Sequence, residues 1–487
     1  MTRRSGILLH PSSLPGGKFN GELGQHAYRF IDFLEAADQK IWQILPLVPT
    51  HNDFSPYQGL SVHAGNPLLI CPVELVNRDW LSPTDLEAFS NIENTFEYKH
   101  AIIRTTFQTF INNAPESDKK EFDVFKKQHA FWLSDYALYV QLKGFFKDDH
   151  WTHWPADFKN RTSSMLELHQ QQHEEEIETI KFEQFVFFGQ WHSLKQYANN
   201  KGILIYGDIP IFIAHDSAEV WANRQLFLLN DEGEPQVVAG VPPDYFSETG
   251  QRWGNPLYDW QALESTNYQW WIERISTQLE LFDQLRIDHF RGFESYWVIP
   301  ADEPTAVKGH WEKGPGAKLF ECFQQQFGEH LPLIAEDLGL ITEEVHALRL
   351  QFGLPGMKIL HFAFDGDPNN PYLPNHHEVN SVVYTGTHDN NTTLGWFHEL
   401  NDQQKQEVDQ YSLGHADEMP WPLIELAVSS TADTCIFPMQ DILELDGMHR
   451  MNTPGTTTGN WQWRFEWDWI KEDLATRLRK LCETYIR

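Results

Sequence analysis

The feature that most constrains the fold is a series of eight short apolar runs, most of which end on a polar residue. They occupy residues 6–9, 41–47, 203–206, 284–287, 331–335, 357–364, 381–384 and 433–437. The runs are continuous and do not alternate with polar residues. This is the pattern of strands buried on both faces of a parallel sheet. We therefore expect eight parallel strands.

Helical stretches separate these runs. Residues 26–39 follow the first run and residues 268–282 precede the fourth. Another helix is expected after Thr342, a suitable N-cap, with Gly353 just beyond its end. Eight strand–helix alternations predict an α/β protein with a (β/α)8 TIM barrel, whose active site lies at the carboxyl ends of the strands. An open doubly wound sheet is the alternative that the same alternation permits.

The spacing of the runs is uneven. Residues 48–202 separate the second run from the third, and within them 126–147 and 174–200 carry apolar residues at helical spacing. We expect residues 48–200 to form an inserted, mostly helical subdomain between strands 2 and 3. Residues 209–260, rich in Gly, Pro and aromatics, are expected to form inserted substrate-binding loops between strands 3 and 4. Together, residues 1–487 are interpreted as a single catalytic barrel with large insertions around its mouth.

The charge balance of the chain limits the classes of molecule that it is expected to bind. The chain has 37 Lys and Arg against 69 Asp and Glu, a formal net charge of −32. Such a surface repels phosphate backbones and anionic lipids, so neither nucleic acid nor a membrane is expected as a partner. The chain also contains 19 Trp, 15 Tyr and 33 Phe. A neutral, stackable partner such as a sugar suits both facts.

Cysteine usage and the start of the chain predict a cytoplasmic location. The four cysteines lie far apart without a CxxC pair, so reduced thiols are expected. The first apolar run is too short for a signal peptide, and no run approaches the ~20 residues of a membrane span.

Metal and nucleotide sites are not expected. No HExxH motif occurs, and Pro315 stands where the lysine of a phosphate-binding loop belongs after Gly309 and Gly314. The sequence therefore predicts chemistry without a metal or a cofactor.

Four acidic residues follow predicted strands: Asp208, Asp288, Glu336 and Asp389. A single aspartate in such a place is usually a cap or turn residue. Several carboxylates at the same end of a barrel suit glycosidic chemistry, in which one attacks or stabilises an oxocarbenium-like centre and another holds a proton.

The neighbours of these residues indicate separate roles. Arg286 lies two residues before Asp288, so in a strand both side chains point to the same side. The guanidinium would hold Asp288 ionised, as a nucleophile requires, although a structural ion pair is the alternative. Glu336 follows an apolar wall near another carboxylate, which favours its acid form and a general-acid role. His388 and Asp389 could grip vicinal hydroxyls of a sugar, or they could belong to a solvated turn.

Motifs along nearly the whole chain resemble those of the amylomaltases, the bacterial 4-α-glucanotransferases or disproportionating enzymes, within the wider α-amylase group. The matching segments are SGILLHPSSLP (5–15), WQILP (42–46), SPYQ (55–58), AGNP (64–67), GVPPDYFSETGQRWGNP (240–256), RIDHFRGF (286–293), AEDLG (335–339), GTHD (386–389) and GNW (459–461). The 240–256 segment is the most specific of these.

The resemblance implies a barrel fold and roles for individual residues. It places the nucleophile at Asp288, the acid/base at Glu336 and the transition-state stabiliser at Asp389. It also implies sugar-binding roles for a further group: Tyr57, Asp244, Trp253, Arg286, His289, His388 and Asn460. Two positions depart from the family pattern, where His63 replaces the usual Phe and Asn391 the usual Asp.

The implied activity is retaining transfer of an α-1,4-glucan segment to a new 4-hydroxyl, with malto-oligosaccharides as substrates. An α-amylase-like hydrolase is the first alternative, and a non-catalytic glucan-binding protein the second. For Trp253 two interpretations stay open, namely stacking on a glucose ring or packing its loop onto the barrel rim.

Overall fold

The computed structural model describes residues 3–243 and 247–487. Its main sheet has eight parallel strands in the order β10-β11-β12-β1-β2-β3-β6-β9. The strands are β1 (Arg4–Leu8), β2 (Ile41–Gln43), β3 (Leu204–Pro210), β6 (Gln284–Asp288), β9 (Leu333–Ala335), β10 (Gly356–Ile359), β11 (Ser381–Tyr384) and β12 (Thr434–Pro438). Each lies in or overlaps one of the eight predicted apolar runs, so the strand prediction is confirmed.

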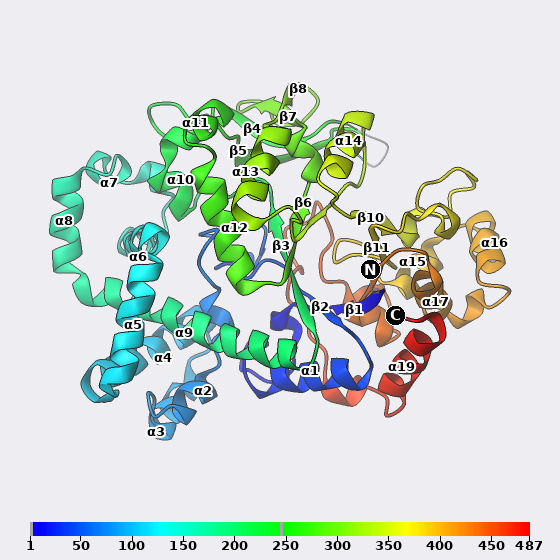
Figure 1. The fold of residues 1–487 in the computed structure, drawn as a ribbon. Coiled ribbons are helices and arrows are strands. Elements are labelled where there is room, and N and C mark those ends of the chain that lie inside the picture. The colour runs from blue at the N-terminus through cyan, green and yellow to red at the C-terminus, as the bar shows by residue number, and fades with distance from the viewer. Residues whose placement is uncertain (1–2, 244–246) are drawn as a thin grey trace.

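The two ends of this sheet meet. The backbone N–H of Ala335, at the end of β9, donates to the carbonyl of Pro355, just before β10, at 2.9 Å. The sheet is thus a nearly closed barrel, visible around β1, β2, β3 and β6 in Figure 1. The TIM barrel is confirmed, and the open doubly wound sheet is not what the chain adopts.

Side chains alternate along the barrel strands. Leu8, Ile334, Met357 and Val382 belong to one cluster that fills the barrel. Their neighbours along the strands, such as Ile7 and Val383, are equally buried but belong to the larger core beneath the helices. Burial on both sides explains why the strands read as continuous apolar runs.

Helices cover the barrel and build the segments around it. They are α1 (Gln25–Ala36), α2 (Pro72–Asn77), α3 (Pro83–Ala88), α4 (Thr95–Asn113), α5 (Glu116–Gln128), α6 (Ala130–Phe145), α7 (Ala156–Lys159), α8 (Ser163–Gln172), α9 (Glu174–Asn200), α10 (Ala218–Ala222), α11 (Trp260–Ser265), α12 (Gln269–Leu281), α13 (Ala317–Phe327), α14 (Glu343–Gln351), α15 (Thr393–Glu399), α16 (Asp402–Tyr411), α17 (Trp421–Ser429), α18 (Met439–Ile442) and α19 (Leu474–Tyr485). Figure 1 shows α3 to α9 on one side of the barrel and α15 to α17 on the other.

The segment between β2 and β3 is largely helical, with one difference from the predicted elements. The helix expected over 126–147 is broken at His129, which ends α5 and precedes α6. The His129 ring accepts a hydrogen bond from Trp132 Nε1 at 3.3 Å across this break. The last helix of this segment, α9, also belongs to the outer layer of the barrel. Its Trp191 Nε1 donates to the carbonyl of Leu281, at the end of α12, at 2.8 Å.

A second, antiparallel sheet lies at one end of the barrel, with the order β5-β4-β7-β8. Its strands are β4 (Val237–Val241), β5 (Gln251–Pro256), β7 (Ser295–Pro300) and β8 (His310–Lys313). The sequence indicated only loops over 209–260, and the connection after β6 drew no prediction at all. The sheet escaped notice because β4 pairs with β7, almost 60 residues further along the chain.

The termini lie side by side (Figure 1), since the Arg3 guanidinium donates to the carbonyl of Tyr485 at 2.8 Å. Among the described residues, no helix is both long and apolar enough to cross a membrane. All four cysteines are free thiols.

Candidate active site

An arginine bridges two carboxylates at the mouth of the barrel. Arg286 on β6 donates to Asp208 on β3 at 2.6 Å and to Asp288, two residues further along its own strand, at 2.8 Å. Asp208 and Arg286 are register partners in the parallel ladder, so the pairing of β3 with β6 sets this contact. Asp208 is fully buried, whereas one third of the Asp288 side chain is exposed. The carboxylate that faces the mouth is therefore Asp288.

Tyr57 reaches this pair from the segment between β2 and β3. Its hydroxyl donates to Asp208 Oδ2 at 2.8 Å, and its ring stacks on His388 with centroids 5.3 Å apart and an interplanar angle of 10°. Burial raises the pKa of Tyr57 well above its ordinary value, and the nearby charges of Asp208, Asp288 and Asp389 add to the effect. Carboxylates from β3, β6 and the loop after β11 thus converge around one phenol.

Glu336 lies directly after β9 and is buried. Its oxygens accept two backbone hydrogen bonds, from His289 N at 2.6 Å and from Leu338 N at 2.9 Å. Burial, followed by the negative charge of Asp288, raises the pKa of Glu336 to about 8, while Arg286 and the two N–H donors oppose the rise. Near neutral pH Glu336 therefore carries a proton, as a general acid must.

His289 turns the chain after β6 with a left-handed backbone, φ 56°. This turn aims its N–H at Glu336. Burial lowers the pKa of His289 to about 3, so its ring is neutral, and its Nε2 is a buried atom without a hydrogen-bond partner. The rings of His289 and of the half-buried Trp253 on β5 pack edge to face, with centroids 4.9 Å apart.

Asp389 lies in the loop after β11, and its side chain is 44% exposed. Asn452 Nδ2 donates to its Oδ1 at 2.6 Å, and the Arg450 guanidinium donates to its backbone carbonyl at 3.0 Å. His388 Nε2 lies 3.4 Å from Asp389 Oδ2. Asp389 therefore has a fixed position with one side left open, as a group that contacts a ligand requires.

Among the predicted sugar-binding residues that the structure describes, Asn460 has no hydrogen bond to this cluster. Asn460 braces its own loop, because its Oδ1 accepts from Thr453 N at 3.0 Å and its amide donates to the carbonyl of Thr456. Asp244 lies outside the described residues. The structure thus joins Tyr57, Arg286, His289 and His388 to the three carboxylates, sets Trp253 against His289, and leaves Asn460 in a loop of its own.

Sequence reasoning missed two contributors. Asp208 was recognised as an acidic residue after a strand but received no role, although its register with Arg286 follows once β3 and β6 are paired. Asn452 was not considered at all. No local signal identifies Asn452, because its contact with Asp389 joins positions 63 residues apart.

The side chains at the two departures from the family pattern have their hydrogen bonds with residues other than Asp288, Glu336 and Asp389. His63 is buried, stacks on Trp132 with centroids 5.9 Å apart and contacts Thr277 through Nδ1 at 3.0 Å. Asn391 donates to Glu399 Oε1 at 2.7 Å, a contact that an aspartate would turn into a repulsion between two carboxylates. Both residues are explained by local packing and hydrogen bonding.

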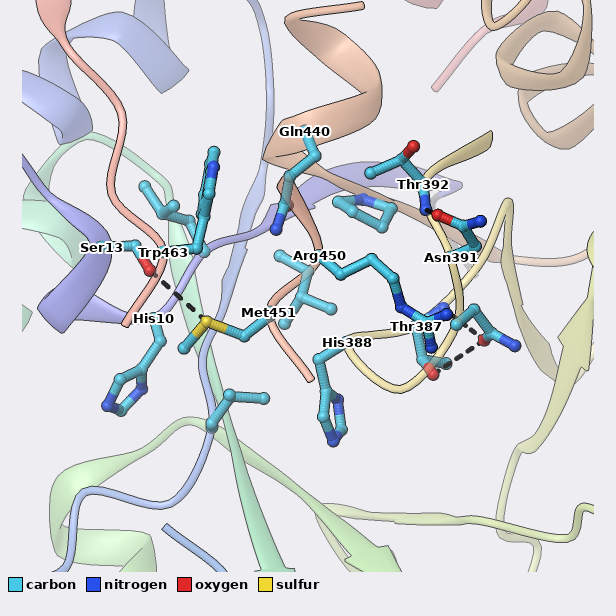
Figure 2. Close-up of a pocket in the computed structure, with 15 residues that line it drawn as sticks. His10, Ser13, Thr387, His388, Asn391, Thr392, Gln440, Arg450, Met451 and Trp463 are labelled. Atoms are coloured by element: carbon cyan, nitrogen blue, oxygen red, sulfur yellow. Dashed lines mark hydrogen bonds between the residues drawn. The ribbon is translucent and has the colours of Figure 1, made fainter. Parts of the chain in front are cut away.

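A small cavity of about 30 Å³ lies beside the Asp389 loop and is large enough for water. Figure 2 shows His10, His388, Arg450 and Trp463 among its lining residues. A larger cavity of about 920 Å³ lies between α4, α6 and α9, and none of the three carboxylates lines it. The chemistry therefore belongs to the barrel mouth and not to the larger hollow.

Comparison with known proteins agrees with this geometry. A model of the 4-alpha-glucanotransferase family matches residues 9–470. The chain is 46% identical to the 4-alpha-glucanotransferases of Synechocystis sp. and of Thermus thermophilus, with alignments that cover 100% and 99% of this chain and 98% and 99% of those proteins. Its structure superposes on the amylomaltase from Streptococcus agalactiae, solved in complex with acarbose, with a TM-score of 0.94, 37% identity and coverage of 100% and 99% of the two chains. A family match over nearly the whole chain, together with such relatives, leads to one conclusion: the chain belongs to the 4-alpha-glucanotransferase family.

Proposed function

We propose that the protein transfers a segment of an α-1,4-glucan to the 4-hydroxyl of glucose or of another glucan, by a retaining double displacement. The observation that carries the proposal is the pairing of a partly exposed carboxylate, Asp288, with a buried carboxyl, Glu336, whose pKa is raised to about 8. Retaining glycosidic chemistry needs one ionised and one protonated carboxyl on either side of the scissile bond.

In the first half-reaction Asp288 attacks the anomeric carbon and Glu336 protonates the departing glycosidic oxygen. The products are a glycosyl ester on Asp288 and a shortened glucan. Arg286 orients the nucleophile and supplies a compensating positive charge. In a substrate complex we expect the two carboxyl groups about 5–5.5 Å apart, the separation that retention requires.

The second half-reaction needs Glu336 as a base. Esterification removes the charge of Asp288, which is one of the causes of the raised pKa of Glu336. The pKa of Glu336 then falls, so the carboxylate can accept the proton of the incoming 4-hydroxyl. The same residue thus serves as acid and then as base, and the new α-1,4 bond forms with retention.

The remaining site residues would hold sugar rings. Asp389, the transition-state stabiliser, would accept hydrogen bonds from ring hydroxyls that strengthen as the oxocarbenium-like centre forms. Tyr57 and His388, stacked on each other, would border the same ring, and His289 has a free ring nitrogen to offer. From the resemblance, Asp244, Trp253 and Asn460 are assigned to sugar binding, and Trp253 would stack on a glucose ring next to the scissile bond, beside His289.

The inserted segments would shape the cleft for a glucan chain. Residues 48–200 supply Tyr57 and residues 209–260 supply Trp253. The side-chain amides of Gln58 and Asn255 tie the two segments together, with N···O distances of 3.3 and 3.5 Å. An acceptor sugar that stacks on Trp253 would displace water and favour transfer over hydrolysis.

Product analysis on maltotriose tests the proposal. A transferase converts maltotriose into glucose and a ladder of longer glucans, whereas an α-amylase-like hydrolase yields only glucose and maltose. A glucan-binding protein without activity leaves maltotriose unchanged. Chromatography of the products separates these outcomes, with Asp288→Asn as the control for contaminating activities.

We propose malto-oligosaccharides and longer α-1,4-glucans as partners and the cytoplasm as the location. The four free thiols support this environment, and the net charge of −32 disfavours nucleic acid as a partner. The carboxylate chemistry described above needs neither a metal nor an organic cofactor.

A further inference from the structure

One buried carboxylate holds both ends of the loop that carries His388 and Asp389. Asp441 Oδ2 accepts from the Thr385 hydroxyl at 2.6 Å, where the loop leaves β11. The same oxygen accepts from the Thr393 hydroxyl at 2.7 Å, where the loop enters α15. Asp441 Oδ1 accepts from the backbone N–H of Thr393 at 2.7 Å. Three hydrogen bonds thus fasten the two ends of the loop to a single side chain.

Asp441 comes from a different part of the barrel. It lies on α18, directly after β12, and is 1% exposed. Thr385 and Thr393 are fully buried. Because β11 and β12 are neighbours in the barrel, Asp441 reaches across from the end of one strand to the loop of the next. Burial raises the pKa of Asp441, and the three donors from Thr385 and Thr393 oppose this rise by replacing part of the lost hydration.

A histidine completes this network. His361 Nε2 lies 3.0 Å from the Thr393 hydroxyl oxygen, which already donates its proton to Asp441. The hydroxyl must therefore accept from His361, which fixes the tautomer with the proton on Nε2 and leaves Nδ1 bare. His361 Nδ1 is indeed a buried atom without a partner, and burial lowers the pKa of this histidine to about 3. The hydrogen bonds of Asp441 to Thr385 and Thr393, which we call the clamp, are thus supported by a neutral His361 ring with a defined orientation.

Between its fixed ends the loop is short and internally braced. Asn390 Oδ1 accepts from both the backbone N–H and the hydroxyl of Thr387, at 2.8 and 2.9 Å, and dashed lines start at the labelled Thr387 in Figure 2. Asp389 N donates to the Thr387 hydroxyl at 3.3 Å. A loop braced in this way moves as a unit, so a shift of its ends is passed on to Asp389.

We propose that Asp441 is a positioning residue for the glucan-transfer reaction, acting through Asp389 by fixing both ends of its loop. The inference rests on the proposed function, in which Asp389 contacts the sugar at the scissile bond. The hydrogen bonds of the Asp441 carboxylate go to Thr385 and Thr393 and to none of the site residues that the structure describes, so Asp441 is not a catalytic residue. A displacement of about 1 Å of a positioned group can cost on the order of 10²-fold in rate, which sets the scale of the expected effect.

A double-mutant cycle tests the proposal in the full-length protein. The variants are Asp441→Asn, Asp389→Asn and their combination, and the readout is kcat/KM for maltotriose consumption well below the lowest melting temperature. We expect Asp441→Asn to reduce kcat/KM on the order of 10²-fold in the wild-type background. In the Asp389→Asn background it should cause no further loss, because Asp389 no longer has a charge to position.

Each outcome of the cycle is decisive. Equal losses from Asp441→Asn in both backgrounds would show a general structural role and overturn the proposal. Wild-type activity of Asp389→Asn beside an impaired Asp441→Asn would do the same, because Asp441 would then act without Asp389. The proposed function fails separately, if the wild-type protein converts maltotriose only to glucose and maltose.

A second pair of variants keeps the test valid if Asp441→Asn does not fold. Thr385→Val keeps the volume of the side chain but loses the hydroxyl, whereas Thr385→Ser keeps the hydroxyl but loses a methyl group. The clamp predicts that Thr385→Ser retains most of the activity and that Thr385→Val loses about tenfold, the effect of one hydrogen bond to a charged group. The reverse order would mean that packing at Thr385 matters and the hydrogen bond does not, which would overturn the proposal.

Discussion

The raised pKa of Glu336 predicts a stability that depends on pH through this one side chain. Between pH 4.5 and about 8 the folded protein keeps a proton on Glu336 that the unfolded chain has released. The free energy of unfolding therefore falls as pH rises through this range, and it falls no further above the folded-state pKa. Glu336→Gln removes the titration, so the variant should gain stability over the wild type as pH rises.

The size of this gain follows from the two pKa values. Each pH unit between 4.5 and 8 contributes about 1.4 kcal/mol. The full range gives at most about 5 kcal/mol in favour of Glu336→Gln at pH 8 and above, relative to pH 4.5. For a chain of this length about 1–2 °C of melting temperature corresponds to 1 kcal/mol, so the difference in Tm should grow by roughly 5–10 °C over the full range.

The assay is thermal melting of both proteins from pH 5 to pH 8.5, monitored by far-UV circular dichroism. Glu329→Gln is the matched control, because Glu329 lies on the exposed surface, and its Tm difference from wild type should not follow the same trend. A Tm difference for Glu336→Gln that stays constant over this range would refute the reasoning. It would mean that burial and Asp288 do not hold the proton on Glu336.

The remaining predictions concern activity and one packing residue. With maltotriose as donor, kcat/KM should fall about tenfold per pH unit above pH 8 as Glu336 loses its proton. This fall of kcat/KM at high pH should be absent with an α-maltosyl fluoride donor, because its leaving group needs no protonation. Asp288→Asn should lower turnover by several orders of magnitude without a change in Tm comparable to that loss, and near-normal transfer would exclude Asp288 as the nucleophile. Trp253→Ala should raise glucose release relative to longer products at matched conversion, whereas an unchanged ratio with a sharply lower Tm would make Trp253 a packing residue. His63→Phe should leave transfer unchanged. It should stabilise the protein by about 2 kcal/mol more at pH 5 than at pH 7.5, because the folded state holds His63 neutral down to a pKa of about 3 and the unfolded chain does not. Equal differences in Tm between variant and wild type at both pH values would contradict this.

Much of the barrel could be predicted because its signals are local. Each parallel strand is buried on both faces, so its apolar run is visible in a few consecutive residues. The ion pair between Arg286 and Asp288 is equally local, since residues two apart on a strand share a side. The same alternation turns Asp337 away from Glu336, so that Asp337 accepts from Met357 N at 2.7 Å and lies 3.2 Å from the Arg349 guanidinium.

The parts that escaped prediction depend on distant pairing. The antiparallel sheet joins β4 to β7, and no periodicity within either strand shows that the other exists. The contact of Asn452 with Asp389 and the clamp of Asp441 on Thr385 and Thr393 likewise join loops that follow different strands. The loop contacts follow from the pairing of β11 with β12, and they become visible only once these strands are placed side by side.

Capture of the covalent intermediate tests the central claim most directly. In Glu336→Gln an α-glucosyl fluoride can still esterify Asp288, because fluoride leaves without a proton, but the variant lacks the base that activates an acceptor. Mass spectrometry of an acidic digest should find one glucosyl unit on the peptide that contains Asp288. The double variant that carries both Glu336→Gln and Asp288→Asn should show no such label. Consumption of the fluoride without a label on this peptide, or a label on another carboxylate, would contradict the account.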